Sequence, residues 1–130
     1  MFTAAVVPRF IAEARAGRPV SIYGDGEQSR DFTYVANVVE ANLLAAEAPA
    51  VNGTALNVAT GRSFTVNELA DTIGEVVGKP VEKEYLPTRP GDVRDSWADI
   101  SAARDVLGYE PHVELAAGLE LTAEAIVARV

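Results

Sequence analysis

Glycine or proline follows nearly every stretch of helically spaced apolar residues in this chain, and this punctuation limits the fold more than any other feature of the sequence. Gly17, Pro49, Gly78 and Gly108 each come directly after such a stretch. Glycine readily adopts the left-handed backbone found at a helix C-terminus, and the residue before a proline avoids the helical region. The sequence therefore predicts several short helices with tight stops. The predicted helices span residues 6–16, 37–48, 66–77, 100–107 and 115–127.

Short segments rich in β-branched and aromatic residues lie between these helices and predict strands. The predicted strands or extended pieces span residues 20–23, 30–34, 55–58 and 81–86. Thr65 and Glu68 form a capping-box pattern, which predicts that the third helix begins at residue 66. Asp99 is predicted to cap the fourth helix. Four or five helices interleaved with four short strands predict an α/β fold class.

The composition supports a folded core and excludes several functions. Hydrophobic residues make up 48% of the 130 residues, as expected for a globular domain. The formal net charge is -8, so we expect binding neither to nucleic acid nor to an anionic membrane surface. The chain has no cysteine and a single histidine, His112, which excludes disulfides, thiolate nucleophiles and a zinc site. Without an apolar run long enough to span a bilayer, or the basic region of a signal peptide, a cytoplasmic location is expected.

The common catalytic and cofactor-binding motifs are absent from the sequence. There is no G-x-G-x-x-G dinucleotide fingerprint, no P-loop and no nucleophile elbow. Gly24-Asp25-Gly26 predicts a turn, with a phosphate cradle as the alternative. Trp97 is predicted to pack in the interior, because large aromatic residues dominate core burial. His112 is predicted to be an exposed polar residue of a loop.

Two segments place an arginine beside an aspartate, in a chain whose 19 acidic residues outnumber its 11 basic ones. Arg30-Asp31 lies in residues 23–35, and residues 89–99 contain Arg89 and Arg94-Asp95. A guanidinium donates paired hydrogen bonds and stays charged at any working pH, which suits a phosphate group. Two arginines from separate loops could therefore clamp a diphosphate. The alternative for Arg30 is a local ion pair with Asp31.

Short motifs that are specific only as a set occur in order along nearly the whole chain: Val6-Val7-Pro8-Arg9-Phe10-Ile11, Tyr23-Gly24-Asp25-Gly26, Arg30-Asp31-Phe32, Leu56-Asn57-Val58-Ala59-Thr60-Gly61, Gly91-Asp92 and Leu107-Gly108-Tyr109. In these motifs the chain resembles the C-terminal part of the NAD-dependent nucleotide-sugar epimerase/dehydratase family, the extended short-chain dehydrogenases. Within that family it is most similar to UDP-hexose and UDP-N-acetylhexosamine 4-epimerases.

The resemblance implies a nucleotide-sugar site built from residues of this chain. Arg30 and Arg89 would hold the diphosphate of a UDP-sugar, and Asp92 would accept hydrogen bonds from the uridine ribose. Asp31 would orient Arg30 without touching the ligand. The remaining implied contacts are those that line the uracil pocket or border the nucleotide: Val6, Ile22, Tyr23 and Phe32.

The resemblance also implies that the chemistry is done elsewhere. In the family the NAD fingerprint, a Ser/Thr and a Tyr-x-x-x-Lys pair precede the matching region, and none of the four tyrosines here has a lysine four residues later. Residues 1–130 are thus expected to form the C-terminal lobe of an extended Rossmann-type epimerase, lacking the dinucleotide-binding half that would bind most of the NAD. No residue is assigned a catalytic role. A fragment, an internal start at Met1 and one half of a split protein all remain open.

The leading hypothesis is therefore the UDP-sugar-binding portion of an NAD-dependent 4-epimerase. The alternatives are a non-catalytic binding or interaction module and a truncated product without activity of its own. Residues 37–48 and 56–58 are expected to pack against the larger half of the family fold. The isolated chain is therefore expected to be marginally stable and to form a homodimer, aggregate or become partly molten, unless it pairs with a separate NAD-binding half.

Overall fold

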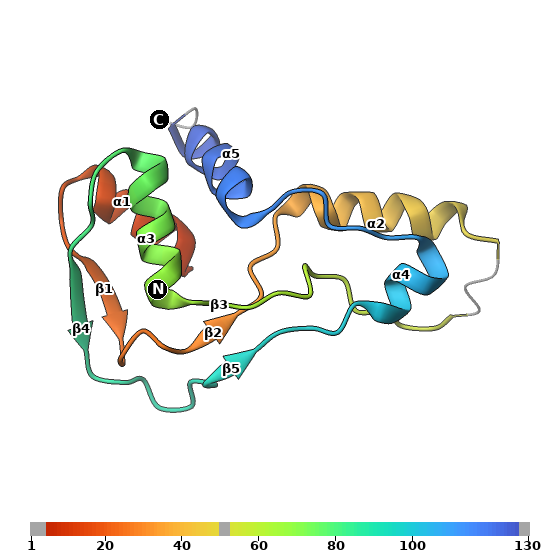
Figure 1. Ribbon diagram of the computed structural model, residues 1–130, viewed down its shortest axis with the longest axis horizontal. Helices are drawn as coiled ribbons and strands as arrows, with labels where there is room; N and C mark the ends of the chain where they lie inside the picture. Colours follow the sequence, from red (N-terminus) through yellow and green to blue (C-terminus); the bar gives the residue numbers. More distant parts are fainter. Residues whose placement is uncertain (1–4, 50–52, 128–130) are drawn as a thin grey trace.

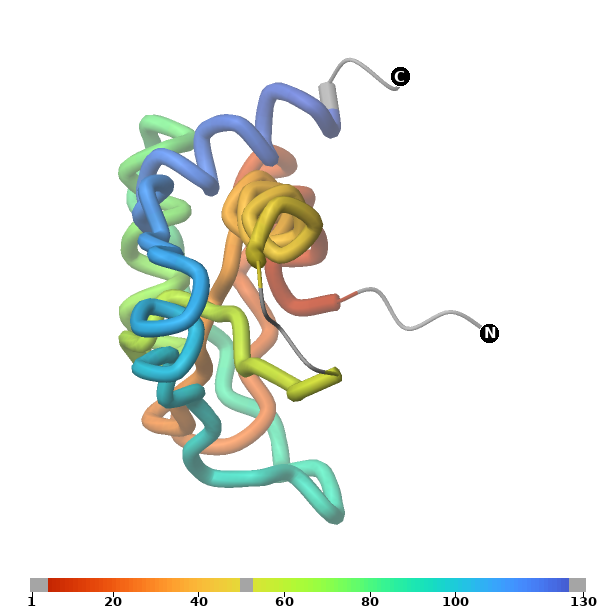
Figure 2. The backbone as a smooth tube through the Cα atoms, turned by 90° about the vertical axis from the view of Figure 1, so that its right-hand side faces the viewer, coloured from red at the N-terminus to blue at the C-terminus, as the bar shows by residue number. Residues whose placement is uncertain are grey.

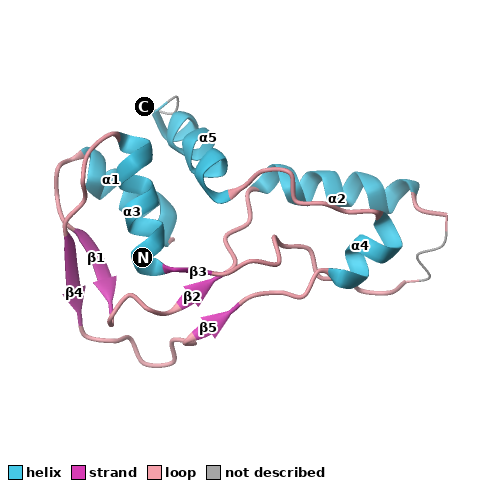
Figure 3. Ribbon diagram, in the orientation of Figure 1, coloured by secondary structure: helices cyan, strands magenta, loops and turns pink. Residues whose placement is uncertain are grey.

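The computed structural model describes residues 5–49 and 53–127. The helices are α1 (Val6–Arg15), α2 (Val35–Glu47), α3 (Val66–Val77), α4 (Ser101–Leu107) and α5 (Leu115–Val127). The strands are β1 (Val20–Tyr23), β2 (Ser29–Arg30), β3 (Phe64–Thr65), β4 (Lys83–Leu86) and β5 (Asp95–Ser96). Within the described residues the elements follow in the order α1, β1, β2, α2, β3, α3, β4, β5, α4 and α5 (Figures 1 and 3). Among the described helices, none has the length and apolarity to cross a bilayer.

The larger hydrophobic core lies at one end of the molecule, where α1, α3 and α5 pack together beside the β1–β4 pair (Figure 1). β1 and β4 run parallel, with Val20 opposite Lys83 and Tyr23 opposite Leu86. The alternate residues of β1, Val20 and Ile22, point into this core and are almost fully buried. The other large buried side chains of the cluster come from helices: Phe10, Ile11, Leu69 and Ile73.

A second, smaller core lies at the other end, where α2 and α4 pack against each other. Its largest member is Tyr109, whose side chain is fully buried and whose hydroxyl donates a hydrogen bond of 2.7 Å to the Ala59 carbonyl. Burial raises the pKa of Tyr109 above its ordinary value, with the nearby carboxylate of Asp31 as the next cause. The phenol is thus a fixed structural hydrogen-bond donor.

Three strands of two residues each connect the two ends. β2 pairs antiparallel with β3 and parallel with β5, so that Ser29 lies opposite both Thr65 and Asp95. A buried amide adds a second connection, because Asn37 of α2 donates to the Val113 carbonyl at 3.0 Å and accepts from the Val113 amide at 3.1 Å. The link between α2 and the segment before α5 is therefore a paired, fully satisfied polar contact.

Most of the predicted elements are confirmed. The α/β fold class and all five helices are present, and the Thr65–Glu68 capping box forms at the start of α3. Gly78 and Gly108 adopt the expected left-handed conformation at the ends of α3 and α4. The prediction of Asp99 as the cap of the fourth helix is wrong by one residue: the N-cap residue is Ile100, and Asp99 accepts a hydrogen bond of 2.9 Å from the Ser101 amide just outside the helix start.

Three further sequence predictions are wrong in detail. The strand expected at residues 55–58 does not form, because no described strand lies beside it to accept its hydrogen bonds, and Leu56 and Val58 pack instead against the second core. The extended piece at 30–34 contributes only Arg30 to a strand, as part of β2. Trp97 is not buried but 62% exposed, because it follows the solvent-facing strand β5. His112 is exposed as expected, 3.3 Å from the carboxylate of Glu40.

One side of α2 is apolar and has nothing packed on it within the described structure. Val35, Val39 and Leu43 are four residues apart, so they form one stripe along the helix, and they are 64%, 50% and 64% exposed. The residues of α2 that are buried, Asn37 and Ala41, lie on the opposite side. Figure 2 views this helix nearly end-on, toward the middle of the molecule. Apolar stripes of this kind commonly mark interaction surfaces.

We expect the Tyr109→Phe substitution to lower the free energy of unfolding by about 1–2 kcal/mol, because it leaves the buried Ala59 carbonyl without its donor. Tyr85→Phe is the matched control. Its hydroxyl donates to Asn67 at 2.8 Å, but the side chain is 51% exposed, so water replaces the lost contact and the cost stays below about 0.5 kcal/mol. Urea unfolding followed by circular dichroism measures both. Equal effects of the two substitutions would contradict the structural role of Tyr109.

Candidate functional site

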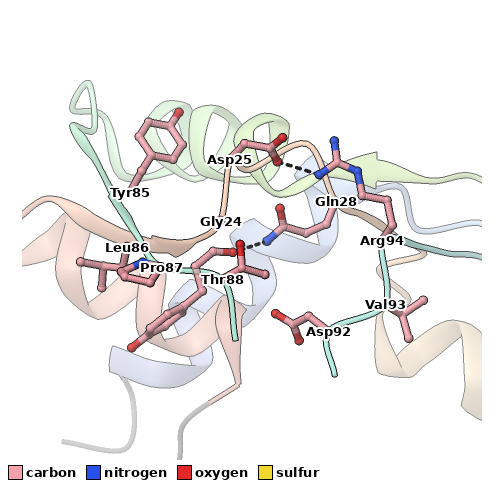
Figure 4. Close-up of a pocket in the computed structure, with 11 residues that line it drawn as sticks. Gly24, Asp25, Gln28, Tyr85, Leu86, Pro87, Thr88, Asp92, Val93 and Arg94 are labelled. Atoms are coloured by element: carbon pink, nitrogen blue, oxygen red, sulfur yellow. Dashed lines mark hydrogen bonds and ion pairs between the residues drawn. The ribbon is translucent and has the colours of Figure 1, made fainter. Parts of the chain in front are cut away.

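The candidate site lies at the ends of β1 and β4. Because the two strands are parallel, their carboxyl ends reach the same edge, and the segments that follow them meet there. The Gly24 amide donates to the Leu86 carbonyl at 2.8 Å, which extends the pairing to the start of both segments. Between the turn after β1 and the loop after β4 is a cavity of about 680 Å³ (Figure 4). Its polar lining residues are Tyr23, Asp25, Gln28, Tyr85, Thr88, Asp92 and Arg94.

The turn after β1 is shaped by two glycines and fixed by one asparagine. Gly24 and Gly26 have φ angles of +102° and +78°, where a side chain would be strained. A Cβ on Gly26 would also overlap the side-chain amide of Asn67, on the first turn of α3. That amide donates to the Asp25 carbonyl at 3.1 Å and accepts from the Tyr85 hydroxyl at 2.8 Å. The prediction of a turn at Gly24-Asp25-Gly26 is therefore confirmed.

An ion pair joins the turn to the loop across the cavity. Arg94 Nη1 donates to Asp25 Oδ1 at 2.9 Å, between residues 69 apart in sequence (Figure 4). This hydrogen bond, followed by one from the Glu27 amide, lowers the pKa of Asp25 below its ordinary value. The same contact raises the pKa of Arg94. Both side chains are more than half exposed, so the pair fixes geometry more than it stabilises the fold.

Arg89 lies on the aromatic ring of Tyr23. Its guanidinium carbon is 3.7 Å from the ring centroid, and the side chain is exposed. A second cation, Arg9 of α1, lies 5.3 Å from the same centroid, while its Nη2 donates to the Ser21 carbonyl at 2.9 Å. Tyr23 therefore contacts cations from two separate elements at the wall of the cavity.

Arg30 lies on β2, outside the lining of the cavity. Its Nη1 donates to the Ser29 carbonyl at 2.7 Å and to the Arg94 carbonyl at 3.3 Å, so its guanidinium is beside the loop that carries Arg94. Arg30 and Asp31, both described residues, form no ion pair or hydrogen bond with each other, and the expectation that Asp31 orients Arg30 is wrong. The Asp31 carboxylate instead accepts hydrogen bonds from the Thr60 amide at 3.0 Å, the Thr60 hydroxyl at 2.6 Å and the Gly61 amide at 2.9 Å.

The structure brings together only part of the residue set that the sequence singled out. Tyr23 and Asp92 line the cavity, and Arg89 borders it on the ring of Tyr23. The side chain of Ile22 is buried in the larger core, so only its backbone can reach a ligand. Val6 and Phe32 are half-buried against that same core and do not line the cavity.

Several lining residues have no assigned role in the sequence interpretation: Asp25, Gln28, Thr88 and Arg94. Gln28 Nε2 donates to the Tyr23 carbonyl at 2.9 Å, which closes the turn from inside. The sequence could have indicated Arg94 as a site residue, because it lies two residues after Asp92 in the same polar loop. No sequence signal indicates the pairing of Arg94 with Asp25, since the two residues are far apart in sequence.

Comparisons with known proteins agree with this architecture. A family model described as GDP-mannose 4,6 dehydratase matches residues 1–122. The chain is 43% identical over 121 residues to the UDP-glucose 4-epimerase of Mycolicibacterium smegmatis, covering 93% of this chain and 38% of that protein. The chain belongs to the NAD-dependent nucleotide-sugar epimerase/dehydratase family.

Solved structures of the family superpose closely. The UDP-glucose 4-epimerase of Thermotoga maritima with UDP-glucose has a TM-score of 0.88 and 44% identity, over 97% of this chain and 40% of that chain. The UDP-glucuronic acid 4-epimerase of Bacillus cereus, in complex with UDP-glucuronic acid and NAD, has a TM-score of 0.89 and 30% identity, with the same coverage of 97% and 40%. The chain thus spans 38–40% of the length of these relatives, and NAD is the family cofactor, as expected.

The described residues do not fit NAD. A dinucleotide pyrophosphate needs a glycine-rich turn that leads from a strand into a helix N-terminus. Here the turn after β1 leads into β2, and the amide of Asn67 occupies the space beside Gly26 that a close-approaching phosphate needs. Within 5–49 and 53–127, no three His, Asp or Glu side chains are grouped so as to hold a metal ion. What the cavity offers is an aromatic ring, a carboxylate and arginines.

We expect the Arg94→Ala substitution to raise the pKa of Asp25 toward its ordinary value, because the main cause of its lowering is removed. The ion pair stabilises the fold at pH values above the pKa of the Asp25 carboxyl in the unfolded chain. This contribution is lost as the pH falls through the lowered pKa of the same carboxyl in the folded chain. Carbon NMR titration of the Asp25 carboxyl measures the shift. Arg62→Ala, whose partner is Glu114, is the control and leaves Asp25 unchanged. An unaltered Asp25 titration in Arg94→Ala would rule out the ion pair in solution.

Proposed function

We propose that this chain is the nucleotide-sugar-binding portion of an NAD-dependent UDP-sugar 4-epimerase, and that it grips the nucleotide diphosphate. The observation that carries the proposal is the cavity at the ends of β1 and β4. Its volume of about 680 Å³ is within the range of small-molecule sites. Its lining offers an aromatic ring for the base and a carboxylate for the ribose. Arg89, on the ring of Tyr23, and Arg30, at the Arg94 carbonyl, lie beside the cavity and would supply the cations for the phosphates.

Each part of the ligand has a candidate partner. Tyr23 offers its ring to uracil, and Asp92, on the opposite loop, offers its carboxylate to the ribose hydroxyls. Arg89 and Arg30 would bind the diphosphate, with Arg30 approaching from β2 through its contact with the Arg94 carbonyl. Val6 and Phe32 would border the nucleotide, and Ile22 would contribute its backbone. These assignments draw on the UDP-glucose and UDP-glucuronic acid carried by the related 4-epimerases.

The reaction proposed for the whole enzyme is inversion at C4 of the sugar, by analogy with the relatives that are named 4-epimerases. We assign the residues of this chain to binding and orientation. A firm grip on the diphosphate leaves the sugar free to turn, which a 4-epimerase requires. Because the residues here do not fit NAD and no tyrosine has the partner lysine, we place the chemistry on a separate NAD-binding half.

The apolar stripe on α2 supports such a pairing. Val35, Val39 and Leu43 would be covered by the NAD-binding half, or by a second copy of this chain. The unpaired segment at 53–60 lies in the same part of the molecule, since its residues pack with α2 and α4 in the second core. A non-catalytic binding module remains the second candidate, favoured by the missing Tyr-x-x-x-Lys pair.

Calorimetric titration of the 130-residue chain tests the proposal. We expect UDP and UDP-sugars to bind, and we expect Arg30→Ala and Arg89→Ala each to weaken UDP binding by about 1.5–3 kcal/mol through loss of charge-assisted hydrogen bonds. In the double variant the two losses should not add, because both arginines contact one diphosphate. Arg18→Ala, on the exposed turn before β1, is the control. UDP affinity unchanged in both single variants would refute the clamp, and titration with dTDP and GDP identifies the preferred base.

Turnover separates binding from catalysis. Since no residue of the described site provides an acid/base pair, we expect the purified 130-residue chain to convert no UDP-glucose or UDP-N-acetylglucosamine, even with NAD added. The measurement is chromatographic separation of the epimers after long incubation, with a full-length 4-epimerase as the positive control. Epimerisation by the chain alone would mean that catalytic residues have been overlooked in it.

A further inference from the structure

In the ligand-free chain, the guanidinium of Arg89 occupies a face of the Tyr23 ring. At 3.7 Å between the guanidinium carbon and the ring centroid, the cation lies directly over the face of the ring. Arg89 is exposed, and within residues 5–49 and 53–127 its side chain has neither an ion-pair partner nor a hydrogen-bond acceptor. Within the described structure, the ring of Tyr23 is therefore the one partner of this guanidinium.

Arg9 is a second cation beside the ring of Tyr23. Arg9 of α1 lies 5.3 Å from the ring centroid of Tyr23 and 5.5 Å from that of Phe10. Its Nη2 donates to the Ser21 carbonyl at 2.9 Å, so this partly buried cation is anchored to the main chain of β1. While this stack persists, Arg89 covers one face of a ring that lines the cavity.

A nucleobase and a guanidinium stack on an aromatic ring at similar separations, so they compete for this face. The backbone around Arg89 gives it room to leave: the loop is exposed, and Gly91, two residues on, has a φ of +83° and no atom near the position of a Cβ. A diphosphate would attract the guanidinium more strongly than the ring does, because its hydrogen bonds are charge-assisted. A nucleoside without phosphates has no such means of displacing it.

We infer that Arg89 makes recognition of the base conditional on the diphosphate. In the ligand-free chain it covers Tyr23, and on binding a nucleoside diphosphate it moves from the ring to the phosphates and leaves the ring to the base. The site thereby discriminates against nucleosides. This inference rests on the proposed function, because it takes Tyr23 as the base platform and Arg89 as a phosphate ligand.

The test is a comparison of uridine, UDP and pyrophosphate on the wild-type chain and on Arg89→Ala. Uridine binding is followed by the upfield ring-current shifts of its H5 and H6 protons in NMR titrations, and UDP binding by calorimetry. We expect Arg89→Ala to tighten uridine binding by about two- to fivefold, the strength of an exposed cation–π contact. The same substitution should weaken UDP binding by roughly tenfold or more.

A second measurement uses the wild-type chain only, so it does not depend on the folding of a variant. Saturating pyrophosphate should draw Arg89 from the ring and tighten uridine binding by about two- to fivefold, and by reciprocity uridine should tighten pyrophosphate binding equally. In Arg89→Ala this coupling should vanish, whereas Arg18→Ala should keep it. In Tyr23→Leu the ring-current shifts should be lost.

The outcomes separate this inference from the proposed function. If the wild-type chain does not bind UDP, the proposed function fails and the inference fails with it. If UDP binds but uridine affinity is unchanged or weaker in Arg89→Ala, the inference is wrong while the nucleotide site stands. Absence of coupling between uridine and pyrophosphate on the wild-type chain overturns it in the same way.

Discussion

Strands β1 and β4 lie side by side and run in the same direction, although much of the chain separates them in sequence. A parallel pair needs a long crossover, and here the crossover carries β2, α2, β3 and α3. The pairing brings the turn after β1 and the loop after β4 to one edge, where the cavity, the Asp25–Arg94 ion pair and the stack of Arg89 on Tyr23 all form. Without this pairing the chain would have no site.

The helices around the larger core hold that edge in place. Asn67 lies in the first turn of α3 and contacts both sides of the site, through the Asp25 carbonyl and the Tyr85 hydroxyl. Since α3 packs on α1 and α5, the turn is fixed to the larger hydrophobic core. The loop that carries Arg89 and Asp92 is exposed along its length, and its side-chain contacts with the turn region are the stack of Arg89 on Tyr23 and the Arg94–Asp25 pair. One wall of the cavity is therefore rigid and the other adjustable.

The sequence predicts those parts of the fold that depend on local signals. Gly78 ends α3 and the Thr65–Glu68 capping box begins it, and both signals lie within a few residues of the element that they define. The strand expected at 55–58 fails because composition indicates that a segment can extend, but not whether a partner strand is within reach. β2, β3 and β5 have two residues each, too few to show a periodicity.

In the site, too, the sequence predicts what depends on local motifs and misses contacts between residues far apart in the chain. The motif that contains Arg89 and Asp92 points to a nucleotide, and both residues lie at the cavity. The ion pair of Asp25 with Arg94 joins positions 69 residues apart, so no local pattern could indicate it. Arg30 next to Asp31 suggested a contact between neighbours in sequence, but adjacent residues of an extended segment point to opposite faces. The Asp31 carboxylate accordingly turns to Thr60 and Gly61.

The exposure of Trp97 has a practical consequence. It is the only tryptophan of the chain, and it directly follows β5, at the end of the loop that forms the adjustable wall of the cavity. Its indole is in contact with solvent and separate from both hydrophobic cores. Tryptophan fluorescence, excited selectively over the four tyrosines, therefore arises next to this loop and not from the protein interior, so it provides an optical reporter of the segment that we propose meets a ligand.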